Sequence, residues 1–131
     1  MNEIPPHDFT LSVNIPIATT EALRDTLASL QNTPLAELWL AHSVSGQSVA
    51  VYKNASRAFV MFLSTNRDTA LHASDPHYAG SPDQVLPIYM ANGQGDEQPM
   101  SETVPTDHAY SALIHFCEHL SPTTQLSWVS D

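Results

Sequence analysis

The chain has 131 residues, 42% of them apolar, which is enough for one domain with a hydrophobic core and too little for two ordinary domains. Fourteen acidic residues against four basic ones give a formal net charge of −10 at pH 7, which repels nucleic acid and anionic membrane surfaces and attracts cationic partners. We therefore expect a single domain over residues 1–131 that binds neither nucleic acid nor membranes.

The cellular compartment is indicated by the cysteine count and by the N-terminus. Cys117 is the sole cysteine, so an intramolecular disulfide is excluded and a reducing compartment is favoured. Residues 1–6 contain neither the basic region nor the apolar run of a signal peptide, and no stretch approaches the roughly 20 apolar residues that span a bilayer. We expect a cytoplasmic protein.

The first elements in chain order are a strand and a helix. Apolar and polar residues alternate from Phe9 to Ile17, which predicts a half-buried strand. Thr19 or Thr20 can then cap a helix that ends near Pro34. The apolar residues that would line one face of this helix are Ala22, Leu23, Leu27 and Leu30.

Strand patterns fill the middle of the chain. Ala36 to His42 and Ser48 to Tyr52 form two strand-like runs, and Gly46 between them suits a hairpin loop. Ala58 to Leu63 is a continuous apolar run of the length expected for a central strand. Residues 66–85 are polar and predict a long loop with one short strand around Leu71.

The last third predicts a second hairpin, a helix and a closing strand. Leu86 to Ala91 and Gln98 to Thr103 flank a turn at residues 92–97, and an amphipathic run from Thr106 to Leu120 precedes Trp128. The order of elements indicates an α+β fold. We expect a mostly antiparallel sheet of about five to six strands with two main helices packed on one side.

One short motif in the late helix raises the possibility of an enzyme. Residues 115–119 match H-x-x-E-H, in which two histidines one turn apart bind zinc and the glutamate activates water. The same helix places Ala109, Leu113 and Phe116 on one stripe, so both histidines fall on the solvated side. We interpret the histidines as part of a solvated face and expect no catalytic residues, no metal and no cofactor.

Acidic residues gather between positions 66 and 103, where no basic residue follows Arg67. One hypothesis is an acidic surface that meets a basic cleft on a partner, with an aromatic anchor nearby. The alternative is a set of solvated turn carboxylates that share no face. The candidate interface residues are Asp68, Asp75, His77, Tyr78, Asp83, Asp96, Glu97 and Glu102.

A series of segments from Gly46 to Trp128 resembles the first-numbered immunity-protein family of bacterial polymorphic toxin systems. The segments are a glycine hairpin at Gly46, Arg57 to Leu63, Tyr89 to Gln94, Val104-Pro105, Ala109 to Phe116 and Trp128. The family usually has a glycine after the late helix, whereas this chain has Leu120-Ser121-Pro122.

The resemblance implies a protein that is no enzyme. It implies an immunity protein that neutralises the C-terminal domain of a cognate toxin, a nuclease or nucleic-acid deaminase, by direct 1:1 binding in interbacterial competition. The acidic residues would then meet a basic surface of the toxin. The alternatives are a secretion-effector chaperone, a small non-catalytic binding module and a small enzyme that uses the histidines of the late helix.

Overall fold

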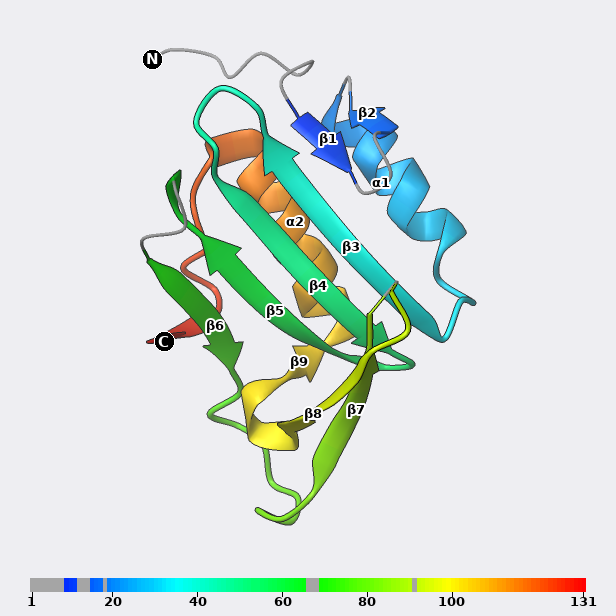
Figure 1. The fold of residues 1–131 in the computed structure, drawn as a ribbon, viewed down its shortest axis with the longest axis vertical. Coiled ribbons are helices and arrows are strands. Elements are labelled where there is room, and N and C mark those ends of the chain that lie inside the picture. The colour runs from blue at the N-terminus through cyan, green and yellow to red at the C-terminus, as the bar shows by residue number, and fades with distance from the viewer. Residues whose placement is uncertain (1–8, 12–14, 18, 66–68, 91) are drawn as a thin grey trace.

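The computed structural model describes residues 9–11, 15–17, 19–65, 69–90 and 92–131 (Figure 1). The helices are α1 (Thr20–Ser29), the short 3-10 helix η3 (Met100–Glu102) and α2 (Thr106–His119). The strands are β1 (Phe9–Leu11), β2 (Ile15–Ile17), β3 (Leu35–His42), β4 (Ser48–Asn54), β5 (Arg57–Leu63), β6 (Ala70–Ser74), β7 (Val85–Tyr89), β8 (Gly95–Pro99), β9 (Val104–Pro105) and β10 (Ser127–Ser130).

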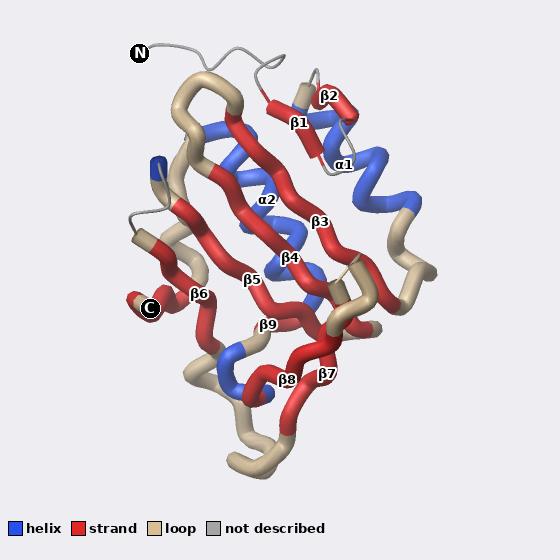
Figure 2. The backbone as a smooth tube through the Cα atoms, viewed as in Figure 1, coloured by secondary structure: helices blue, strands red, loops and turns tan. Residues whose placement is uncertain are grey.

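The main sheet is antiparallel, with the order β10-β6-β5-β4-β3-β1-β2, and β9 pairs with the first two residues of β5. The helices α1 and α2 cover one face of this sheet (Figure 1). Strands β7 and β8 form a separate two-stranded hairpin (Figure 2). The expected α+β fold is confirmed, and the short strands β1, β2 and β9 extend the sheet beyond its longer strands.

The core lies mainly between the sheet and the two helices. Central strands β4 and β5 are buried on both faces because each face has its own cover. On the helix side, the side chains that pack together include Leu23, Leu27, Leu40, Val49, Val51, Val60, Leu113 and Phe116. Trp128 packs against this cluster, and its indole N–H donates to the Thr123 carbonyl at 2.7 Å.

An aromatic row occupies the opposite face of the sheet. Trp39 meets Tyr52 edge-on, Tyr52 lies beside Phe59, and the Phe59 ring stacks on the His72 ring with centroids 5.8 Å apart. The side chains of Leu86 and Ile88 from β7 pack over this row. The hairpin therefore forms a third layer over part of the sheet.

Both ends of α1 are capped by side chains. The Thr19 hydroxyl accepts a hydrogen bond from the Ala22 N–H at 3.0 Å, which satisfies a free amide of the first turn. At the other end, the Lys53 ammonium donates to the carbonyls of Leu30 and Gln31 at 2.7 and 3.4 Å. A cation at this end is also favoured by the helix dipole.

The end of α2 is closed by a residue other than glycine. Leu120 caps the helix in the left-handed conformation, with φ of 53°, and its N–H donates to the Phe116 carbonyl. Glycine adopts this conformation without the steric cost that a side chain imposes. Leu120 offsets part of that cost because its side chain packs against the helix-side core.

Two element boundaries differ from the sequence predictions. The single strand expected from Phe9 to Ile17 is two short strands, β1 and β2, that pair antiparallel with each other. Alternation of apolar residues cannot show where a chain reverses direction. In the late hairpin, the second strand runs from Gly95 to Pro99 and not from Gln98 to Thr103, because the Met90 N–H donates to the Gln94 carbonyl and closes a shorter turn. The helix η3 occupies most of the remaining predicted strand.

Candidate protein-binding surface

The outward face of the β7–β8 hairpin is an exposed apolar row. Burial alternates along β7, so that Leu86 and Ile88 face the main sheet while Val85, Pro87 and Tyr89 point away from it. Val85 is 42% exposed and Tyr89 is 50% exposed. Exposed large apolar side chains in one row are a feature of protein-binding surfaces.

Carboxylates border this row. The antiparallel register places Glu97 opposite Pro87, on the outward face, and Asp96 opposite Ile88, on the other face of the hairpin. Both acidic residues are exposed. Asp83 is exposed in the loop that enters β7. We call the set formed by Asp83, Val85, Pro87, Tyr89, Asp96 and Glu97 the hairpin surface.

The hairpin is attached to the main sheet by hydrogen bonds as well as by apolar packing. The Asn54 side-chain amide donates to the Pro87 carbonyl at 2.7 Å, and the Met100 N–H donates to the Gln84 carbonyl at 3.0 Å. No described strand pairs with the outer edge of β8. Charged residues on an edge strand oppose its pairing with strands of other molecules, so Asp96 and Glu97 also protect this edge from aggregation.

Positive charge is scarce around the hairpin surface. Of the four basic residues, Lys53 is buried against α1 and Arg57 is engaged with loop carbonyls and a carboxylate. Arg24 is exposed on α1, on the other side of the sheet, and no lysine or arginine follows Arg67 in the sequence. The hairpin surface therefore presents carboxylates without nearby compensating cations from its own segment.

Asp75, one of the predicted interface residues, makes an internal ion pair. Its carboxylate lies 2.9 Å from the Arg57 guanidinium, and both side chains are largely buried. Burial by itself raises the pKa of Asp75, but the hydrogen bond from Arg57, the His77 N–H and the charge of Arg57 outweigh it, so the net pKa is lowered. Asp75 holds the loop against β5.

Tyr78 also packs on its own domain. Its hydroxyl lies 3.0 Å from the Ser81 carbonyl oxygen and 2.9 Å from the Gln84 side-chain oxygen, and its ring lies beside the Arg57 guanidinium. A Cβ atom added at Gly80 would clash with this hydroxyl, so the loop can close on Tyr78 because residue 80 has no side chain.

Glu102 belongs to an internal cluster around His72. Its carboxylate lies 3.0 Å from Nε2 of the His72 ring, while Asp131 lies 2.6 Å from Nδ1. His72 is 8% exposed. These contacts tie η3 and the C-terminus to β6.

The predicted interface residues thus divide into two groups. Asp75, Tyr78 and Glu102 make internal contacts, whereas His77, Asp83, Asp96 and Glu97 are exposed. The four exposed residues lie on the hairpin or on the loop before it. Asp68 is outside the described residues.

The exposed apolar residues of β7 were missed by sequence reasoning. The run Val85-Leu86-Pro87-Ile88-Tyr89 is apolar at every position, although a two-stranded hairpin over a sheet can bury only one of its faces. That mismatch is the signal that could have identified the outward row.

The histidines of α2 lie near each other on its surface. The His115 and His119 rings have centroids 4.6 Å apart, and burial together with the charge of His119 lowers the pKa of His115. Cys117 is buried beside them, and burial raises the pKa of its thiol. Within the described parts of the chain, no three side chains of His, Cys, Asp or Glu converge as metal ligands would.

No model of a protein family matches the chain, and no curated protein matches it. Among the described residues, no helix has the length and apolar character needed to cross a membrane.

Proposed function

We propose that the chain is an immunity protein that binds and neutralises the C-terminal domain of a cognate bacterial toxin, a nuclease or nucleic-acid deaminase, in the cytoplasm. The observation that carries the proposal is the hairpin surface, an exposed apolar row with an aromatic residue and a carboxylate border. The family resemblance supports the same function. The partner would be bound 1:1, without a cofactor.

The mechanism follows from the chemistry of that surface. Enzymes that act on nucleic acid need a cationic cleft to hold phosphates. Asp83, Asp96 and Glu97 would face such a cleft, and Tyr89 would act as the central aromatic anchor that interfaces favour. Occupying the cleft excludes the nucleic acid and so stops the reaction without any chemistry by the inhibitor.

Co-expression tests the proposal directly. The chain is expressed with the product of the gene immediately upstream, and growth rescue and co-purification with that protein's C-terminal domain are measured. The proposal expects both rescue and a stable complex. Absence of toxicity, rescue and complex would overturn the immunity function.

A matched pair of variants tests the surface. Val85→Arg places a cation on the hairpin surface, and Val129→Arg places one on β10, where the valine is 41% exposed against 42% for Val85. We expect Val85→Arg to weaken binding by roughly tenfold or more, because charge repulsion is added beside an interface anchor. Val129→Arg should bind like the unchanged chain. Equal binding by both variants would exclude the hairpin surface as the interface.

The outer edge of β8, with which no described strand pairs, favours one second candidate, a secretion-effector chaperone. An exposed strand edge can bind an extended segment by adding it to the sheet. Such a chaperone would bind the flexible N-terminal region of an effector and not its folded toxic domain. Separate pull-downs with these two regions of the upstream product distinguish the two functions.

A further inference from the structure

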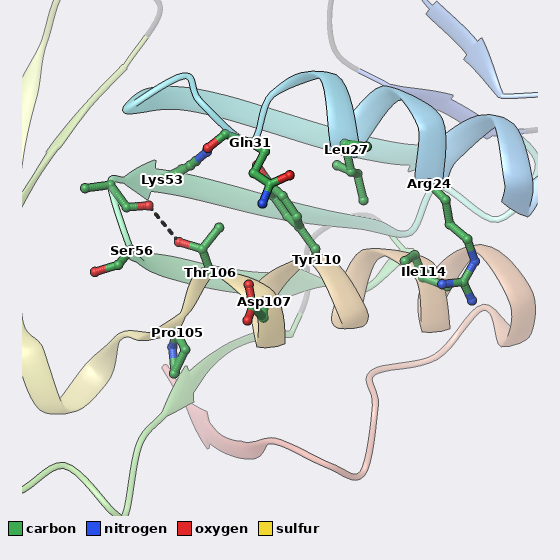
Figure 3. A pocket seen from close by; sticks show the side chains of 12 residues that line it. Arg24, Leu27, Gln31, Lys53, Ser56, Pro105, Thr106, Asp107, Tyr110 and Ile114 are labelled. Carbon is green, nitrogen blue, oxygen red and sulfur yellow. Dashed lines mark hydrogen bonds between the residues drawn. The ribbon is translucent and has the colours of Figure 1, made fainter.

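A cavity of about 600 Å³ opens between α1 and α2, beside the turn that joins β4 to β5 (Figure 3). Pockets for small molecules have volumes of roughly 300–1,000 Å³, so this cavity can hold a small organic molecule. It lies on the helix side of the main sheet, whereas the hairpin surface lies on the other side.

Apolar side chains form much of the cavity wall. Leu27 and Ala28 come from α1, Ile114 comes from α2, and Pro105 comes from β9. Figure 3 shows Leu27 on α1 and Tyr110 on α2 with their side chains in the space between the two helices. The hydrocarbon part of a ligand would be removed from water along this wall.

Lys53 places a cation at one end of the cavity. It is 3% exposed, and its ammonium donates to the carbonyls of Leu30 and Gln31. An ammonium group has three N–H donors, so one donor remains without an acceptor among the described residues. Burial lowers the pKa of Lys53, and an anion in the cavity would favour its charged form.

Tyr110 adds a buried hydroxyl at the same end. The Lys53 ammonium lies 5.7 Å from the centroid of the Tyr110 ring. The Tyr110 hydroxyl is buried and has no hydrogen-bond partner among the described residues. Such a group is costly in a folded protein unless something satisfies it. Burial raises the pKa of Tyr110, so the hydroxyl keeps its proton and can donate it to an acceptor.

We propose that this cavity binds a small organic carboxylate with an apolar body. The carboxylate accepts hydrogen bonds from the Lys53 ammonium and the Tyr110 hydroxyl, and the body lies against Leu27 and Ile114. A carboxylate fits better than an amine at this end because the Lys53 ammonium and the Tyr110 hydroxyl can both donate to it. Thr106 and Asp107 also line the cavity, but the Thr106 hydroxyl donates to the Ala55 carbonyl and Asp107 is exposed. The site is separate from the hairpin surface, so it extends the proposed function and does not depend on it.

Calorimetry with octanoate tests the site on the full chain, with octylamine as a ligand of equal length and opposite charge. We expect octanoate to bind and octylamine to give no measurable binding. Tyr110→Phe should weaken octanoate binding by roughly three- to tenfold, as the loss of one hydrogen bond predicts. It should not lower the melting temperature, because the removed hydroxyl has no protein partner among the described residues.

Two further variants locate octanoate within the molecule. Arg24→Gln removes the cation at the far end of the cavity and should leave octanoate affinity unchanged. Val85→Arg alters the hairpin surface and should also leave it unchanged. Lack of octanoate binding, equal binding of octylamine, or an unaltered affinity in Tyr110→Phe would overturn the proposal, whatever the result of the toxin experiment.

Discussion

Arg57, the first residue of β5, holds two neighbouring segments against the sheet through its guanidinium. Its guanidinium donates to the Thr103 hydroxyl at 2.8 Å, to the Thr103 carbonyl at 2.6 Å and to Asp75 at 2.9 Å. These contacts join β5 to the segment before β9 and to the loop after β6. A partly buried guanidinium needs such partners, because an unpaired charge away from water is costly.

At this scale, Asp75→Asn should destabilise the fold by roughly 1 to 3 kcal/mol at neutral pH, since a hydrogen bond between charged groups is lost. The folded-state pKa of Asp75 is lowered, so its stabilisation is present above the ordinary carboxyl pKa of 3.8 and is lost as pH falls below it. The difference in unfolding free energy between the two proteins should therefore shrink toward pH 2 to 3.

Denaturant titrations at several pH values measure this difference. Asp83→Asn, at an exposed aspartate of the same loop region, is the matched control and should change stability little at any pH. A deficit in Asp75→Asn that stays constant from neutral to acidic pH would contradict the ion-pair explanation.

At the scale of elements, the loop between β6 and β7 is built around Tyr78. Its ring contacts Arg57, and its hydroxyl contacts Ser81 and Gln84. Polar composition alone predicts an open loop in this region. The inward tyrosine gives the loop a small core of its own, which fixes where β7 begins.

Gly80→Ala should destabilise the protein by roughly 1 to 2 kcal/mol, because the new Cβ atom must displace the Tyr78 ring. Thermal unfolding measures the loss. In a Tyr78→Ala background the same substitution should cost almost nothing, since the clashing ring is gone. Equal costs in the two backgrounds would show that Gly80 is needed for another reason.

At the scale of the whole molecule, the two faces of the main sheet have different covers. Two helices cover one face and bury its apolar residues, while the β7–β8 hairpin covers only part of the other face (Figure 1). The partial cover leaves a hairpin with its own outward face. Glu97 lies on that face, and the exposed Asp83 and Asp96 lie near it, in a chain whose formal net charge is −10.

Salt dependence distinguishes a local acidic surface from general acidity. Asp83→Asn, Asp96→Asn and Glu97→Gln together should slow association with the proposed toxin and reduce its sensitivity to salt. The matched control is Asp25→Asn, Asp107→Asn and Glu118→Gln, which removes the same charge from exposed positions of α1 and α2. Stopped-flow rates at several salt concentrations measure the effect. Equal slopes for the two triple variants would point to net charge alone.

Local sequence signals were sufficient for most of the elements. The Thr19 cap, the spacing of Leu23 and Leu27, and the apolar run from Ala58 to Leu63 each predicted its element from local chemistry. The α+β class followed from the order of these elements. Element boundaries were predicted less accurately where the signal was a polar turn, as in the late hairpin, because several turn lengths fit the same residues.

The sequence by itself determined the fold class and the scarcity of positive charge. Only the tertiary structure decided which carboxylates face outward. Asp75 and Asp83 look alike in a polar loop, but the register of β5 and β6 brings Arg57 to one of them. The cavity beside Lys53 could not be predicted from the sequence either, because its walls come from two helices that are distant in the chain. Contacts of this kind depend on packing between elements, which no local pattern encodes.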